Sequence, residues 1–477
     1  MASLKEKSIN AFVWDISGTL ITHGSSFIIS IVLARLLSPS EFGLIGMVMV
    51  FVTISQVFVD AGFSSSIIQE KDISETLCNS IFLINILTGI FLSGVFYLSA
   101  GPVSDFYQIE ELEILVQYFS VIFIINSFNI VQVAILTREL NFKALTIRQV
   151  ISNVIGGIVG IILAYLNYGV FSLVAQKLVA ASISTLLLWS LSSWTPKFEF
   201  SKMEIKKIFG FSSSMFFDKL LFALSNQVNI LGIGKLFSPS TLGFYTRAQT
   251  LNELVIKYSS TSLNKVLYPV LSKLQADSDE FYSLYIKTVN IAVFLSFLIG
   301  GILLILSEPL IISLFGEKWQ PSIFIFQCLL LATCNHPVNS MVAISLISKG
   351  YASRNFKIGI YRKVLKLVPL VIAYLLGFNA FIYSFICVDY FLLIVNILIS
   401  KYYLGFPIKD HLLIIKDGLI SLLLGILMYN YFSNASVYLL TLFYMLIYLG
   451  INLIFRNKAL FYLLNHFLNF IQKNKNL

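Results

Sequence analysis

Charged side chains lie inside several long apolar stretches of this sequence, and seven of them could bind a ligand or an ion. They are Asp15, Lys177, Asp218, Lys219, Arg247, Glu253 and Lys257. A charge at the centre of a bilayer costs about 2.5–3.5 kcal/mol on insertion scales, so such groups are expected to face a polar interior or one another. The chemistry open to them is the binding of a polar ligand or of an ion in a water-filled cavity.

Uncharged polar residues continue the pattern at helical spacing. One stretch carries Thr53, Gln56, Asp60 and Ser64 on a single helix face, and the stretches that hold Asp15, Asp218 and Glu253 carry similar stripes. We therefore expect Thr53, Gln56 and Asp60 to line the cavity. Local alternatives remain for several charges: Asp15 and Arg247 lie near span ends and could snorkel to the surface, and Glu253 could pair with Lys257 one turn later.

The elements that must position these groups are membrane-spanning helices. The chain has 477 residues, of which 57% are hydrophobic and 12% are charged, whereas a soluble protein carries about a quarter charged residues. Apolar runs of about 20 residues recur without the alternation of a β-barrel strand. About fourteen spans are predicted, near residues 12–36, 42–63, 77–100, 113–137, 146–166, 169–191, 209–233, 242–264, 286–306, 322–347, 358–377, 380–402, 411–429 and 433–455.

Lysine and arginine predict the orientation of the spans. If the N-terminus is cytoplasmic, the inner loops hold most of these residues, including Arg138, Lys143 and Arg148, and the outer loops hold few. We expect both termini in the cytoplasm. The net charge of +9 then reflects topology and contact with anionic lipid, and nucleic-acid binding is excluded because no basic soluble face is predicted.

A nine-residue motif occurs twice, as "RLLSPSEFG" at residues 35–43 and as "KLFSPSTLG" at residues 235–243. Six predicted spans separate the copies, so both point the same way through the membrane, as in a parallel repeat. We expect an all-α membrane protein with two six-helix lobes, residues 1–200 and 201–404, followed by two extra helices in residues 405–477. In each copy a proline ends the reach of one helix, and Ser40, Thr241 or their neighbours cap the next.

No enzyme signature is present. The longest predicted loops, 192–208, 265–285 and 307–321, are too short for a soluble catalytic domain. The sequence lacks a P-loop, GxSxG, HExxH and a dinucleotide fingerprint, and its four cysteines have no metal-ligand spacing. We expect neither an enzyme nor a metal or organic cofactor. "GGIVG" favours close helix packing at Gly156 and Gly160.

Four stretches of the sequence carry a resemblance to a known family. They are "FVWDISGTLITHGSSFIISIVLARLLSPSEFGLIGMVMVFVTISQVFVDAGFSSSIIQ" near the N-terminus and, further on, "TRELNFKAL", "LGFYTRAQTLNELV" and "VLYPVLSKLQ". They resemble Wzx-type polysaccharide flippases of the multidrug/oligosaccharidyl-lipid/polysaccharide (MOP) exporter superfamily. The resemblance implies movement of an oligosaccharide on undecaprenyl diphosphate from the inner to the outer leaflet of the bacterial inner membrane. The partners that the resemblance implies are this lipid-linked glycan, membrane lipids and the polysaccharide polymerase machinery. It also implies a protein that can work as a monomer.

An anionic diphosphate suits the cations predicted above, namely Lys177, Lys219, Arg247 and Lys257, because they replace the water that the diphosphate loses. The resemblance also implies a proton or sodium gradient, whose ion Asp15, Asp218 and Glu253 could carry. The nearest alternative is a drug/cation antiporter of the same superfamily, which would favour an acidic cavity. A glycan polymerase would need a large outer loop, and a structural scaffold would not need a repeated polar stripe.

Overall fold

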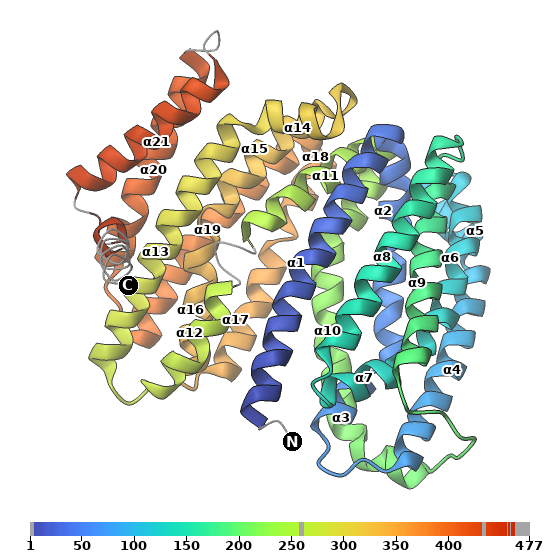
Figure 1. Ribbon diagram of the computed structural model, residues 1–477. Helices are drawn as coiled ribbons and strands as arrows, with labels where there is room; N and C mark the ends of the chain where they lie inside the picture. Colours follow the sequence, from blue (N-terminus) through green and yellow to red (C-terminus); the bar gives the residue numbers. More distant parts are fainter. Residues whose placement is uncertain (1–3, 257–261, 432–435, 456, 458, 463–477) are drawn as a thin grey trace, which may run out of the picture. The chain divides into compact units, whose positions relative to one another are not determined.

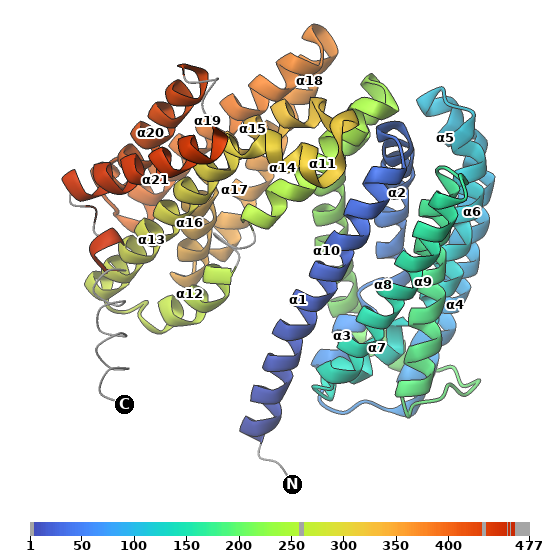
Figure 2. The same ribbon diagram turned by 45° about the horizontal axis from the view of Figure 1, so that its top comes forward.

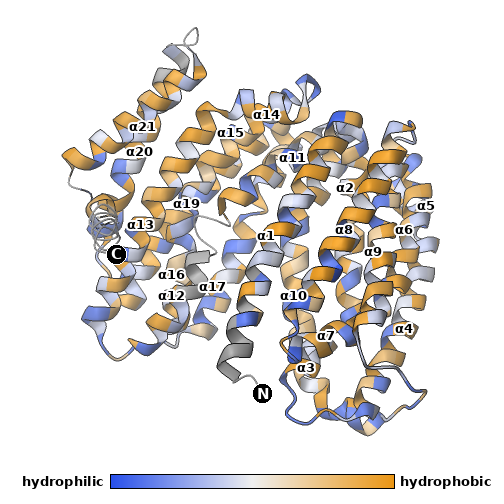
Figure 3. Cartoon of the chain, viewed as in Figure 1, coloured by the Kyte–Doolittle hydropathy of each residue, from blue (hydrophilic) through white to orange (hydrophobic). Residues whose placement is uncertain are grey.

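The computed structural model describes the chain except for residues 1–3, 257–261, 432–435, 456, 458 and 463–477 (Figure 1). Within the described part, the regular structure is helical and no strand occurs, which confirms the all-α class. Apolar residues cover the long helices, and polar residues gather mainly in the loops (Figure 3). The described helices pack into two compact units, Met1–Gly243 and Phe244–Leu477.

The first unit contains ten helices among the described residues. They are α1 (Leu4–Leu36), α2 (Pro39–Asp60), α3 (Phe63–Gln69), α4 (Glu75–Leu98), α5 (Ala100–Tyr107), α6 (Glu111–Ser127), α7 (Ile130–Arg138), α8 (Phe142–Tyr165), α9 (Phe171–Leu191) and α10 (Lys202–Leu236). Helix α8 lies between α1 and α9, α4 packs along α6, and α10 packs along α2 (Figures 1 and 2). Gly156 and Gly160 of α8 lie against Ala180 and Gln176 of α9, which confirms their predicted packing role.

Helix α11 (Pro239–Ile256) begins at the end of the first unit and continues into the second. The other helices of the second unit are α12 (Ser262–Lys273), α13 (Ser278–Ile305), α14 (Ser307–Phe315), the 3-10 turn η2 (Glu317–Trp319), α15 (Pro321–Thr333), α16 (His336–Ser348), α17 (Ala352–Leu365), α18 (Val368–Leu376), α19 (Phe378–Leu404), α20 (Ile408–Tyr431) and α21 (Val437–Ile454). Helix α13 packs against α15, α16, α20 and α21. Tyr444 and Tyr448 hold α21 against α13, because their buried hydroxyls donate to the carbonyls of Phe297 and Phe294 of α13 at 2.9 and 2.7 Å.

The helices support a multi-pass membrane protein. Among the described residues, ten helical segments are long and apolar enough to cross a bilayer, with α15 and α16 taken as one segment. The pair α6 and α7, bent by 42°, would make an eleventh. Three predicted spans, 242–264, 358–377 and 411–429, coincide with α11, α17–α18 and α20, which are not among these segments of the described residues. The count of fourteen, the two-lobe repeat and the cytoplasmic termini remain predictions.

The repeated motif forms two helix starts that contact each other. Ser38 caps α2 by accepting from the Glu41 N–H at 3.4 Å, and Ser238 caps α11 by accepting from the Thr241 N–H at 3.3 Å. The caps are therefore the serines before the prolines, not Ser40 and Thr241, and each proline is the first residue of its helix. A Cβ on Gly43 would lie 1.8 Å from the Pro239 carbonyl oxygen, and a Cβ on Gly243 would lie 1.9 Å from that of Pro39. The two copies thus pack reciprocally, glycine against proline.

The first compact unit is longer than the lobe predicted from the repeat. It extends beyond residue 200 because α10, expected to open the second lobe, packs on α2, α3 and α4. A unit of packing and a sequence repeat are different quantities, so the lobe boundaries near residues 200 and 404 stay predictions.

Arg138 stabilises the sharp turn that follows α3. Its guanidinium, at the end of α7, donates to the carbonyls of Ile67 at 3.0 Å, Lys71 at 2.6 Å and Glu70. Arg138→Ala would leave these carbonyls without their donor and is expected to lower the free energy of unfolding by about 1–3 kcal/mol. Thermal unfolding of the purified protein tests this. Arg138→Lys should recover only part of the loss, because one ammonium can reach fewer carbonyls. An unchanged midpoint of thermal unfolding in the Ala variant would show that Arg138 does not stabilise this turn.

Candidate functional site

The polar site of the first unit lies where α10 crosses the end of α2 and the start of α3. The backbones approach closely here: a Cβ on Gly62, which has a φ of 77°, would lie 2.2 Å from the Ser212 carbonyl oxygen. The Ser66 and Ser212 hydroxyls are 2.6 Å apart and both side chains are buried. The rings of Phe58 and Phe216 meet edge to face at 5.1 Å. These contacts hold α10 in register with α2.

One helical turn beyond this crossing, Lys219 of α10 pairs with Asp60, the last residue of α2. The Lys219 ammonium donates to Asp60 Oδ2 and also to the Ser64 hydroxyl at 3.3 Å. Asp60 Oδ1 accepts from the Ser64 N–H at 3.1 Å and so stabilises the first turn of α3. The Asp60 side chain is 18% exposed and the Lys219 side chain 38%. We call Asp60, Ser64 and Lys219 the α2–α10 polar site.

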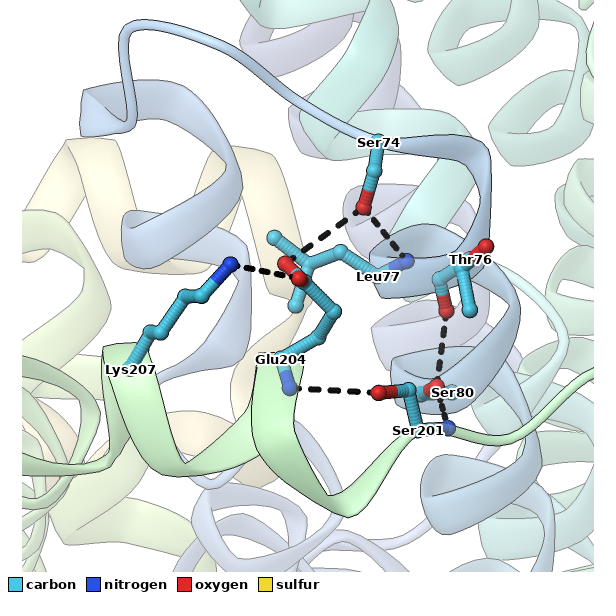
Figure 4. Close-up of polar contacts among 7 residues, drawn as sticks. All are labelled: Ser74, Thr76, Leu77, Ser80, Ser201, Glu204 and Lys207. Atoms are coloured by element: carbon cyan, nitrogen blue, oxygen red, sulfur yellow. Dashed lines mark hydrogen bonds and ion pairs between the residues drawn. The ribbon is translucent and has the colours of Figure 1, made fainter.

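The start of α10 is anchored to the start of α4 (Figure 4). The Ser201 N–H donates to the Ser80 hydroxyl at 2.8 Å, and the Ser74 hydroxyl donates to Glu204 at 3.5 Å. Glu204 also pairs with Lys207 at 2.5 Å. These bonds fix the entry of α10 into the first unit and hence the position of Lys219, four turns further on.

The loop before α10 is fastened to the same helix start. Lys197 pairs with Glu75 at 2.7 Å, and its N–H donates to Asn79 Oδ1 at 3.0 Å. The hydrogen bond that the Lys197 ammonium donates to Glu75 raises the pKa of Lys197 above its usual value, so the pair stays charged at neutral pH. The loop between α9 and α10 is thus attached to the start of α4 at Lys197.

Two asparagines that the sequence analysis did not single out complete the polar stripes. Asn126 of α6 donates to Gln56 Oε1 at 3.1 Å, and Asn153 of α8 donates to the hydroxyls of Ser25 and Ser26 at 3.1 and 2.8 Å. Part of the predicted stripe on α1 therefore packs against α8. The signal was available, since each asparagine interrupts an apolar run, in "IFIINSF" and "VISNVIG".

The remaining predicted site residues lie elsewhere. Lys177 on α9, Asp15 on α1 and Asp218 on α10 are exposed, and Thr53 is half-buried on α2. In the second unit, the Arg247 guanidinium lies 6.0 and 5.8 Å from the ring centres of Phe315 and Trp319, and Glu253 accepts from Gln249 at 2.9 Å. Lys257 lies outside the described residues. Of the predicted cations, the structure brings Lys219 together with a predicted cavity residue, Asp60, and the binding and coupling roles of the whole set stay predictions.

Known proteins are similar to this chain in sequence and in fold. Residues 32–324 match the family described as polysaccharide biosynthesis protein. The chain belongs to this family. TuaB of Bacillus subtilis (strain 168), a teichuronic acid biosynthesis protein, is 25% identical over 388 residues, 79% of each chain. The lipopolysaccharide biosynthesis protein WzxC of Escherichia coli (strain K12) is 23% identical over 78% of this chain and 76% of its own. These relatives support the Wzx-type resemblance.

The fold of this family member matches that of solved MOP-superfamily transporters. The lipid II flippase MurJ, in an inward closed conformation, superposes with a TM-score of 0.72 over 94% of this chain and 99% of its own, at 16% identity. An inward-facing multidrug resistance MATE transporter of the MOP superfamily gives 0.66 over 83% and 98%, at 15% identity. At such identities the likeness establishes the fold, which this chain shares with both solved transporters.

Proposed function

We propose that this polysaccharide biosynthesis protein moves oligosaccharide repeat units linked to undecaprenyl diphosphate from the inner to the outer leaflet of the bacterial inner membrane. It does so by alternating access, as a transporter rather than an enzyme. Family membership over residues 32–324 carries the proposal, since that match includes the α2–α10 polar site and both copies of the repeated motif. The transporter fold and relatives named for teichuronic acid and lipopolysaccharide biosynthesis support it.

In this proposal Lys219 contributes to binding the diphosphate, and Asp60 is its counter-ion when the site holds no ligand. The ammonium already has a partner, so a diphosphate must compete with one carboxylate rather than with full hydration. Because a diphosphate carries more charge than a carboxylate, the exchange can favour the substrate while keeping an unpaired ammonium out of the empty site. Lys177, Arg247 and Lys257 are the further proposed cations of the pathway.

Ion coupling is assigned to carboxylates of the same set. Protonation, or binding of Na⁺, neutralises a carboxylate and shifts the balance between inward-open and outward-open states. Asp15, Asp218 and Glu253 are the proposed carriers, and all three are exposed on their helices. Replacing each by its amide should reduce the dependence of transport on the ion gradient, and an unchanged dependence in the triple variant would remove them from the coupling step.

The expected cellular result is a build-up of completed, lipid-linked repeat units when the protein is absent. Mass spectrometry of undecaprenyl-linked oligosaccharides from a deletion strain should show the species accumulate, and a plasmid copy of the wild-type gene should remove it. If no such species accumulates and the cells instead become sensitive to cationic dyes, the protein acts as the drug/cation antiporter that the MATE-like fold also permits.

A further inference from the structure

The second unit holds a cavity of about 470 Å³ that the proposed transport does not use. It lies between α13 and α20, two helices that pack along each other, and Ala459 and Tyr462 also line it. Its polar lining comes from Tyr282, Ser283, Lys287 and Asn290 of α13 and from Asp410 of α20. Residues four and seven apart on a helix share a face, so α13 presents these side chains as one wall.

Hydrogen bonds between side chains of α13 and α20 hold the cavity wall in place. The Tyr282 hydroxyl donates to Asp410 Oδ2, and the Tyr285 hydroxyl lies 2.8 Å from His411 Nε2 just behind it. His411 is itself held through Nδ1, 3.1 Å from the Pro407 carbonyl oxygen. These bonds fix the first turn of α20 against α13, so Asp410 keeps its place when the cavity binds a ligand.

Two features of the lining point to a ligand. Asn290 is 6% exposed, and its side-chain Oδ1 has no hydrogen-bond partner among the residues that the structure describes. A buried amide oxygen without a donor is unfavourable, and a bound donor would relieve it. Lys287 forms no ion pair with a described carboxylate, and its ammonium lies 3.7 Å from the ring centre of Tyr462. The cavity thus offers an acceptor, a carboxylate and a cation together.

The position of the cavity along α13 indicates the kind of ligand. The helix begins with Asp279 and Glu280, and residues 291–305 contain no charged side chain. The cavity lies between these parts, where a membrane helix passes from the headgroup layer into the hydrocarbon. Ile286 and Ile291 supply its apolar lining. A molecule that fits both parts has a charged head and an apolar body, as a phospholipid does.

We propose that this cavity binds one phosphatidylethanolamine molecule by its headgroup. Lys287 binds the phosphate, while Asp410 and the Asn290 Oδ1 accept hydrogen bonds from the primary ammonium group. The acyl chains lie along the apolar part of the bundle. An anionic lipid such as phosphatidylglycerol would match Lys287 but would leave Asp410 beside a second negative charge, so the pair of opposite charges selects the zwitterion.

Native mass spectrometry of the full-length protein with added lipid tests the proposal. Phosphatidylethanolamine is expected to bind about tenfold more tightly than phosphatidylglycerol of the same chain length. Lys287→Ala should weaken phosphatidylethanolamine binding about tenfold, and Asp410→Asn should bring the two lipids close to equal affinity. Lys363→Ala, an exposed lysine on α17, is the matched control and should leave both affinities unchanged.

The outcomes that would overturn the proposal are equally definite. Equal binding of both lipids by the wild-type protein would do so, as would Lys287→Ala and Asp410→Asn variants that behave like the control. If the Asp410 variant does not fold, Ser283→Trp decides, because Ser283 is exposed and a large side chain there fills the cavity without changing charge. Displacement of the lipid by an equal concentration of free phosphoethanolamine would assign the cavity to a soluble ligand and reject the lipid.

Discussion

Replacing Gly43 by Ala is expected to lower the free energy of unfolding by at least about 2 kcal/mol and to reduce transport in proportion to the loss of folded protein. The added Cβ would lie 1.8 Å from the Pro239 carbonyl oxygen, and Gly243→Ala would place a Cβ 1.9 Å from the Pro39 carbonyl oxygen. Both obstacles are backbone atoms at helix starts, which cannot rotate away as a side chain can, so the helices must move apart. Thermal unfolding of the purified variants measures the effect.

The matched control is Gly24→Ala within α1. No atom lies within 4 Å of the position that its Cβ would take, and alanine has the higher helix propensity, so stability should stay the same or rise by up to about 1 kcal/mol. Because the two motif copies contact each other reciprocally, Gly43→Ala and Gly243→Ala should have effects of similar size. A Gly43 variant as stable as the Gly24 control would show that the two helix starts do not pack as described.

Removing Lys219 from the α2–α10 polar site should abolish most transport. Lys219→Ala leaves the Asp60 carboxylate without its cation, and Asp60→Asn leaves the Lys219 ammonium without its anion, while the Asn oxygen can still accept from the Ser64 N–H. Each change should cost about 1–2 kcal/mol of stability, between the values for exposed and for buried ion pairs. Transport of the lipid-linked glycan, measured per folded molecule, should fall more than tenfold for Lys219→Ala.

The double variant Asp60→Asn with Lys219→Ala separates structure from function. It has no unpaired charge, so its stability should lie above the sum of the single losses, with a coupling of about 1 kcal/mol. Its transport should stay low if Lys219 contacts the diphosphate, and should recover if the pair is only structural. Lys206→Ala, an exposed lysine near the start of the same helix, should change neither quantity. Single variants with wild-type stability and transport would contradict a role for the site.

Hydropathy located most of the helices, because the backbone N–H and C=O groups of an apolar run in a membrane must form their hydrogen bonds within the run, as a helix does. The predicted span 42–63 corresponds to α2, Pro39–Asp60, and the repeated motif correctly marked the starts of α2 and α11. The same logic missed internal breaks. The span predicted at 113–137 is bent between α6 and α7, at the polar residues Asn126 and Asn129, and 358–377 divides into α17 and α18 just before Pro369.

The candidate site was predictable as a set of residues but not as a set of contacts. Asp60 and Lys219 were both singled out as polar groups in apolar runs, yet assigned to different tasks. They are distant in sequence, and their pairing depends on how α10 crosses α2, which is decided by Gly62, Ser66 and Ser212. Periodicity specifies the face of one helix and not its partner helix. The reciprocal contact of Gly43 and Gly243 was hidden for the same reason, although the repeat itself was plain.

Translocation by the purified protein in sealed vesicles tests the central proposal most directly. Undecaprenyl-diphosphate-linked oligosaccharide from the deletion strain would be placed in vesicles with the wild-type protein, with Lys219→Ala or with no protein. An impermeant glycosidase added outside would then report how much glycan reaches the outer leaflet. We predict that the wild-type protein exposes the inner-leaflet pool and that the Lys219 variant does so more than tenfold more slowly. Wild-type vesicles that match protein-free vesicles, while transporting a cationic dye, would contradict the flippase proposal.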